Sequence, residues 1–168
     1  LGISNKNLNY VSILLPPIYV LSVKTFTDRI NHIQQEMAKH KLAFEFIFDY
    51  DIYAINDAID QQYFAENSGL SPASKSITLK HICAWQRALQ NNHQQILVFE
   101  DDVVLSHDFN TKLQNILNCA QNIKPGYLIF LGGADTKVPK SFFKNQTEFY
   151  ELGMPTAEAY ITDLTAIK

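Results

Sequence analysis

Short apolar runs alternate with segments of helical periodicity along the chain, and this alternation limits the possible folds more than any other feature. Six runs are expected to form strands, and they cover residues 18–23, 43–48, 95–100, 127–133, 148–152 and 157–162. Runs this short, bounded by turn residues, are typical of buried strands. Because predicted helices separate most of them, the sequence predicts an α/β domain with a mostly parallel sheet.

Four helices are predicted between these strands, one of them a short helix over residues 57–66. The expected N-caps of the three longer helices are Thr25 or Thr27, Ser74 or Ser76, and Ser106. Apolar residues three and four positions apart mark the face that each helix should bury. These residues are Phe26, Ile30, Ile33 and Met37 on the first helix, Ile77, His81, Ile82, Trp85, Ala88 and Leu89 on the third, and Phe109, Leu113, Ile116, Leu117 and Ala120 on the last.

Composition excludes several classes of protein. The 168 residues suffice for one domain with a sizeable core, and 46% hydrophobic with 18% charged residues exclude a disordered chain. A net charge of −3 without a basic run excludes nucleic acid as a partner. No apolar run has the length of a membrane-spanning helix. Cys83 and Cys119 lack CxxC spacing and are expected to be free thiols, which favours the cytoplasm.

The two ends of the sequence bear on its domain organisation. Residues 159–168 resemble a strand followed by the first turn of a helix, and the first residue is Leu1. We therefore expect a single domain over residues 1–168 that is incomplete at its C-terminus.

Three consecutive acids, Glu100, Asp101 and Asp102, follow the third predicted strand. In an open α/β sheet, ligands bind beyond the carboxyl ends of the strands. Adjacent carboxylates repel one another unless a cation lies among them, and oxygen ligands of this kind suit Mg²⁺ or Mn²⁺. Residues i and i+2 of an extended segment point the same way, so Glu100 and Asp102 can share one cation while Asp101 faces elsewhere. The alternative is a solvated turn that caps the next helix.

This acidic stretch, "LVFEDDVVLSHDF", resembles the acidic motif of glycosyltransferase family 25, which contains lipopolysaccharide, lipooligosaccharide and collagen galactosyltransferases. Other segments resemble the family in the same order. They are "IYVLSVKTFTDRI" with Arg29 as its basic residue, "LKHICAWQRAL" with His81 and Trp85, and "PTAEAYITDLTAIK" with Thr156, Ala159 and Tyr160. The resemblance covers residues 18–168 and departs at Lys80, where the family commonly has serine.

The resemblance implies a GT-A-like fold, a Rossmann-type domain that binds a nucleotide sugar. The acidic motif would be its DxD-type site, with Glu100 and Asp102 holding Mn²⁺ or Mg²⁺ against the diphosphate. The family is mostly inverting and uses UDP-galactose, so the expected product is a galactosylated lipopolysaccharide, lipooligosaccharide or related bacterial surface glycan. A lipid-linked acceptor would bring a cytoplasmic protein into peripheral contact with the inner membrane.

Individual site residues follow from this resemblance and from position. The expected donor contacts are Ser22, Arg29, His81, Asp101, Gly133, Thr156 and Tyr160. Inverting transfer needs a general base for the acceptor hydroxyl, and Glu158 is preferred over Asp135 and Asp163. Each residue also has a structural interpretation: an exposed ion pair for Arg29, core packing for His81 and Tyr160, and a simple turn for Gly133.

Two other functions compete with this one. A non-catalytic module of the same fold would bind a sugar or a partner without turnover. The departure from the family pattern at Lys80 is compatible with this hypothesis. A metal-dependent phosphoesterase is the third hypothesis, but such sites usually gather several His and Asp ligands. Only His107 lies near the acids in the sequence.

Overall fold

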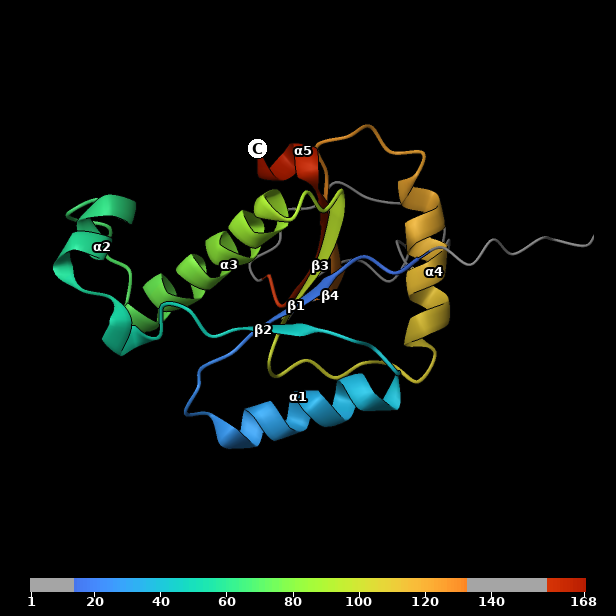
Figure 1. Ribbon diagram of the computed structural model, residues 1–168, viewed down its shortest axis with the longest axis horizontal. Helices are drawn as coiled ribbons and strands as arrows, with labels where there is room; N and C mark the ends of the chain where they lie inside the picture. Colours follow the sequence, from blue (N-terminus) through green and yellow to red (C-terminus); the bar gives the residue numbers. More distant parts are fainter. Residues whose placement is uncertain (1–13, 133–156) are drawn as a thin grey trace, which may run out of the picture.

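The computed structural model describes residues 14–132 and 157–168, which form one five-stranded sheet with helices packed on both faces (Figure 1). The strands are β1 (Ile18–Leu21), β2 (Glu45–Ile47), β3 (Gln95–Glu100), β4 (Leu128–Gly132) and β5 (Ala159–Asp163). The helices are α1 (Thr27–Lys39), η1 (Ile52–Ala54, a 3₁₀ turn), α2 (Asp57–Tyr63), α3 (Pro72–Gln90), α4 (Phe109–Ala120) and α5 (Leu164–Ile167). The predicted α/β class is confirmed. The strand expected at 148–152 lies outside the described residues.

The sheet has the order β2-β1-β3-β5-β4. Strand β1 lies between β2 and β3 and is parallel to both. Strand β5 is antiparallel to both of its neighbours, β3 and β4. The sheet is therefore mostly parallel, as predicted, with one reversed strand that the sequence pattern did not indicate. This reversal brings the start of β5 to the carboxyl end of β3.

Alternate side chains of the central strands build two separate cores, because successive residues of a strand point to opposite faces. Val20, Leu97 and Phe99 pack on one face against α1 and α4. Tyr19 and Val98 lie on the other face, against α3. Figure 1 shows α3 on one side of the sheet, with α1 and α4 around the other. The central strands are covered on both faces, which explains why they are continuous apolar runs.

The predicted start of α3 was wrong. The helix begins at Pro72, and Ser71 is its N-cap, with Ser71 Oγ accepting a hydrogen bond from the Ser74 backbone N–H at 3.1 Å. Proline at the first helical position has the φ angle that a helix needs and lacks an N–H that would have no partner there, so the helix begins earlier than the apolar periodicity suggests.

The predicted buried face of α3 was also partly wrong. Leu89 is 38% exposed, whereas Lys80 is almost fully buried. The Lys80 ammonium donates to the Asp51 carboxylate at 2.5 Å and to the Asp49 carbonyl at 2.8 Å. A lysine with such partners can be buried, so hydropathy alone misplaces the face. Lys80 thus joins α3 to the segment that follows β2.

The other expected caps also differ from the structure. The residue that precedes α1 is Phe26, whose side chain makes no capping hydrogen bond. Phe26 is 46% exposed and so does not belong to the buried face. At α4 the preceding residue is Asp108, while Ser106 contributes its backbone carbonyl, which accepts from the Phe109 N–H at 2.9 Å. The predicted buried face of α4 is confirmed at Leu113, Leu117 and Ala120, which are all buried.

Candidate active site

The carboxyl ends of β1 and β3 form the edge of the sheet where the polar residues of interest lie. These strands are adjacent and parallel, and Leu21 pairs in register with Glu100. The chain continues from β1 to β2 on one side, while β3 occupies the other side. Such a switch point leaves a crevice beyond the strand ends in open α/β sheets. Ser22 and Asp101, the next residue of each strand, therefore lie side by side at this switch point, and both are buried.

Asp101 is the buried anchor of this edge. It is 4% exposed, and its carboxylate accepts hydrogen bonds from Ser22 Oγ at 2.7 Å and from an Arg29 guanidinium nitrogen at 2.8 Å. The other terminal nitrogen of Arg29 lies 3.2 Å from Asp102. Arg29 comes from the first turns of α1, so one guanidinium joins this helix to both aspartates. Each carboxylate oxygen of Asp101 therefore already accepts a hydrogen bond from the protein.

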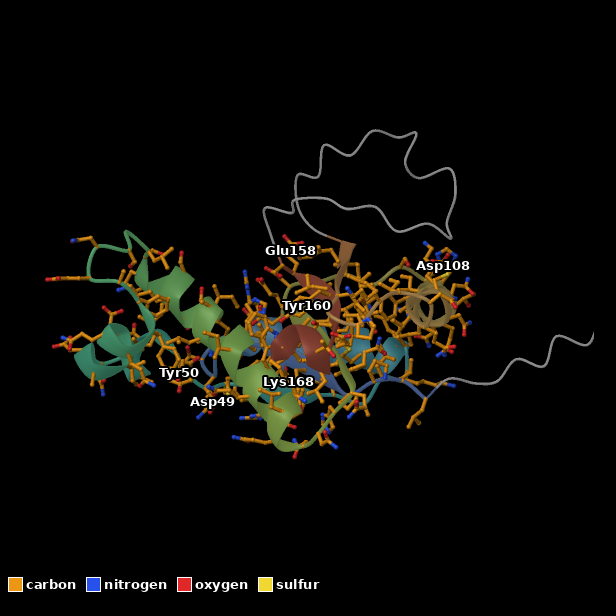
Figure 2. All side chains as sticks on the ribbon, turned by 90° about the horizontal axis from the view of Figure 1, so that it is seen from above. Asp49, Tyr50, Asp108, Glu158, Tyr160 and Lys168 are labelled. Atoms are coloured by element: carbon orange, nitrogen blue, oxygen red, sulfur yellow. The ribbon has the colours of Figure 1, made fainter. Side chains whose placement is uncertain are left out.

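Glu100 has a different electrostatic environment. Burial, followed by the negative charges of Asp102, Glu158 and Asp101, raises the pKa of Glu100 from 4.5 to about 7. The backbone N–H of Glu100 donates to the Glu158 carbonyl at 2.8 Å, which fixes the residue before β5 beside the acidic stretch. Figure 2 shows Glu158 and Tyr160 together at this end of β5. Carboxylates at the end of β3 and just before β5 therefore meet here, with Arg29 as a nearby cation.

Three ring side chains extend from this cluster into the core on the α3 side. The Trp85 indole N–H donates to the Tyr160 hydroxyl at 2.9 Å, and His81 Nδ1 lies 3.0 Å from the same hydroxyl. The other nitrogen of His81, Nε2, is 4.0 Å from a Glu100 oxygen. Burial lowers the pKa of His81 to about 4 and raises the pKa of Tyr160, so both side chains are neutral near pH 7.

A cleft of about 580 Å³ continues from the carboxylates along α4. Asp102 and Glu158 line it, together with the polar side chains of Ser106 and Lys112. Its remaining lining is mostly apolar and comes from β3, the β3–α4 connection, α4 and β4, with Val104, Phe109, Leu113, Ile116 and Leu131 among the residues. The acidic cluster therefore lies beside an open space that can hold a ligand group of substantial size.

Comparison with known proteins identifies the family of the chain. A family model described as glycosyltransferase family 25 (LPS biosynthesis protein) matches residues 15–161. The chain belongs to this family. It is also 32% identical over 103 residues to a Haemophilus influenzae protein whose name assigns it provisionally to the glycosyltransferases. That match covers 57% of this chain and 36% of the relative, so the chain spans about a third of the curated relative it matches.

In this family 25 chain, most of the residues that the sequence singled out come together at one edge of the sheet. They are Ser22, Arg29, His81, Glu100, Asp101, Asp102, Glu158 and Tyr160. Asp163 lies at the other end of β5, where its side chain accepts from the backbone N–H groups of Gly126 and Ala166. Gly133, Asp135 and Thr156 lie outside the described residues. The described part of the predicted site is therefore compact, apart from Asp163.

Sequence reasoning missed the contribution of Trp85 to this cluster. Trp85 was expected only to pack in the core, but its N–H binds the Tyr160 hydroxyl. The i, i+4 spacing of His81 and Trp85 was the available signal, because it places both rings on one face of a helix. Their shared partner on β5 could not be read from the sequence, since the register and direction of β5 decide it.

The residues present suit a divalent cation whose coordination is completed by a ligand. Within the part of the chain that the structure describes, no group of three or more His, Cys, Asp or Glu side chains could hold a metal. Mg²⁺ commonly binds through one or two carboxylates plus substrate phosphates, and Glu100 and Asp102 offer such a pair. Burial, and after it the neighbouring carboxylates, raise the pKa of Glu100, so a cation beside it would favour its charged form. The donor set therefore fits a cation brought together with a diphosphate.

No helix of the described residues combines the length and apolar character that crossing a bilayer requires.

Proposed function

We propose that this chain forms the donor-binding part of a metal-dependent, inverting glycosyltransferase with a GT-A-like fold. The donor is a UDP-sugar, most simply UDP-galactose, and the acceptor is a lipopolysaccharide, lipooligosaccharide or related surface glycan. One observation carries the proposal: Glu100, Asp102 and Arg29 meet at the switch point between two parallel strands. Membership of family 25 supports glycosyl transfer as the reaction class.

The proposed roles follow from the charges at this edge. Glu100 and Asp102 would hold Mn²⁺ or Mg²⁺, which neutralises charge that develops on a departing diphosphate. The Arg29 side chain is 48% exposed, so its guanidinium can also face a phosphate while it pairs with Asp101. Asp101 and Ser22 hold that guanidinium in place. The chain's own residues thus provide both a cation site and a fixed cation for the leaving group.

The transfer step itself requires a base. The acceptor hydroxyl oxygen forms a bond to the anomeric carbon, the bond from that carbon to the diphosphate oxygen breaks, and UDP leaves with the electron pair. A carboxylate takes the hydroxyl proton. Glu158 is our candidate because it lines the cleft beside Asp102. The cleft along α4 gives an acceptor room next to both residues.

Calorimetric titration of UDP and UDP-galactose, with and without Mn²⁺, tests the donor site. We expect binding that depends on Mn²⁺ and is lost in Asp102→Asn, because this change removes one carboxylate of the cation site. Asp57→Asn is the matched control, since Asp57 is an exposed acid at the start of α2. A folded wild-type protein that binds neither nucleotide under any condition would contradict the proposal. Binding without transfer to any acceptor would instead favour a non-catalytic module.

A further inference from the structure

We propose that Tyr160, held by Trp85, fixes His81 as the neutral tautomer with its proton on Nε2, and that this N–H orients the Glu100 carboxylate. The inference deepens the proposed function, because it rests on Glu100 as a ligand of the donor-site cation. His81 and Tyr160 thereby become positioning residues rather than donor contacts.

The first step concerns the Tyr160 hydroxyl. An indole N–H can only donate, so in the 2.9 Å contact with Trp85 the tyrosine oxygen accepts. The single hydroxyl proton then needs an acceptor of its own. Tyr160 is 1% exposed, which excludes bulk water. His81 Nδ1 lies 3.0 Å from the hydroxyl. Among the residues that the structure describes, it is therefore the acceptor, and it carries no proton.

The second step follows from the chemistry of imidazole. A neutral ring with a bare Nδ1 carries its proton on Nε2. Nε2 is the atom that faces Glu100, 4.0 Å from Oε1. This is longer than a hydrogen bond. The Glu100 side chain is 26% exposed against 13% for His81, so the carboxylate is the less confined partner and the one that can close the gap.

Rigid elements hold the whole arrangement. His81 and Trp85 lie one turn apart on the 19-residue helix α3. Tyr160 is on β5 and pairs in register with Val98 of β3, two residues before Glu100. Donor, acceptor and carboxylate thus come from three packed elements rather than from loops. Side chains held in this way give the positional precision that a metal site needs.

A neutral donor suits this position. A protonated histidine would place a positive charge beside the carboxylates and compete with a divalent cation. A fixed neutral N–H orients Glu100 without that competition, as outer partners of metal ligands commonly do. Loss of such partners typically lowers metal affinity by about 10–100-fold.

Long-range ¹⁵N NMR spectra of the ring nitrogens of His81, recorded without metal, test the tautomer directly. We expect the Nε2–H form in the wild type and a mixture of tautomers in Tyr160→Phe, which lacks the hydroxyl donor. Tyr127→Phe is the matched control, because the Tyr127 hydroxyl accepts from Gln95 Nε2 at 2.6 Å, away from His81. A wild-type His81 with its proton on Nδ1 would overturn the proposal.

A second variant keeps the test decisive if Tyr160→Phe does not fold. Trp85→Phe keeps an aromatic ring and removes the indole donor, which frees the Tyr160 oxygen to accept from His81. The Nδ1–H tautomer should then gain population. A folded Trp85→Phe protein with an unchanged tautomer would count against the chain of hydrogen bonds described above.

Mn²⁺ titrations in the presence of UDP, monitored by water proton relaxation, test the link to Glu100. Tyr160→Phe should bind Mn²⁺ about 10–100-fold more weakly than the wild type, and Tyr127→Phe should bind it equally well. An altered tautomer with unchanged Mn²⁺ affinity would overturn the link to Glu100. A wild-type protein that binds no Mn²⁺ even with UDP present would sink the metal site of the proposed function, and the metal-free spectra would still decide the tautomer of His81.

Discussion

At the scale of single residues, three neighbouring carboxylates have three different environments. Asp101 is buried and paired, Asp102 is half exposed beside Arg29, and Glu100 is half-buried with a raised pKa. The sequence predicted that Asp101 would face away from the other two, because side chains alternate along an extended segment. It could not predict that Ser22 and Arg29 would be the partners of Asp101, since these come from β1 and α1.

Removal of the Asp101 carboxylate should destabilise the fold. Asp101→Ala leaves Ser22 and Arg29 without their shared acceptor, and we expect a loss of about 1–3 kcal/mol in the free energy of unfolding. Urea denaturation measures it. Glu66→Ala, at an exposed position after α2, should stay within about 0.5 kcal/mol of the wild type. Equal stability of the two variants would show that the buried contacts of Asp101 contribute nothing net.

At the scale of elements, buried charges join helices to the connections they pack against. Lys80 ties α3 to Asp49 and Asp51 after β2, and Figure 2 shows Asp49 and Tyr50 beside this helix. Tyr50 has a φ angle of +58°, and its carbonyl accepts from Ser76 Oγ of α3 at 2.7 Å. A left-handed tyrosine needs this support, because the conformation is unfavourable for a side chain with a Cβ. The segment after β2 is thus fixed mainly by α3.

Lys80→Met should therefore destabilise the protein by about 1–3 kcal/mol, because the Asp51 carboxylate and the Asp49 carbonyl lose their donor. A double-mutant cycle with Asp51→Asn separates the pair from general packing effects. We expect the double variant to be more stable than the sum of the single effects predicts. Strictly additive effects would mean that the two side chains do not act together.

A second buried charge, Glu36, links α1 to the connection after β3. The hydrogen bond from Lys39 holds the pKa of Glu36 below its ordinary value of 4.5, against the effect of burial, and the backbone N–H of Leu105 adds to this. A folded-state pKa below the unfolded one gives stability that is fully present above the unfolded value. This stability is lost as the pH falls through the folded value.

Glu36→Gln should consequently be less stable than the wild type near neutral pH, and the difference should shrink as the pH falls below about 4.5. Urea midpoints measured across this range give the result. Glu66→Gln serves as the control at an exposed position. Parallel curves for wild type and Glu36→Gln would show that the charge of Glu36 does not contribute.

At the scale of the whole molecule, alternation predicted the α/β class and the parallel strands, because βα repeats bury apolar strands on both faces. The direction of β5 could not be predicted in this way, because an apolar run has the same sequence pattern in a parallel and in an antiparallel strand. That direction matters for the site. Antiparallel pairing with β3 brings Glu158 to Glu100 and Tyr160 to Val98, so the start of β5 lies within the candidate site.

The segment formed by η1 and α2, which we call the peripheral arm, is less buried than the central strands of the sheet. None of the residues of η1 and α2 is buried, and Tyr53 is fully exposed. Figure 1 shows α2 at the far end of α3, away from the sheet. By contrast, the central residues of β1 and β3 are buried on both faces. Segments with few buried apolar contacts open locally at low free energy, whereas core strands open only with global unfolding.

Hydrogen exchange followed by mass spectrometry should therefore divide the chain in two. Amides of η1 and α2 should exchange by local opening and respond little to low concentrations of urea, while amides of β1 and β3 should exchange only with global unfolding. Asp101→Ala lowers global stability, so it should speed exchange in β3 and leave α2 almost unchanged. Protection of the α2 amides as strong as that of the β3 amides, with the same change in exchange rate in Asp101→Ala, would contradict this. The peripheral arm would then belong to the same cooperative unit as the sheet.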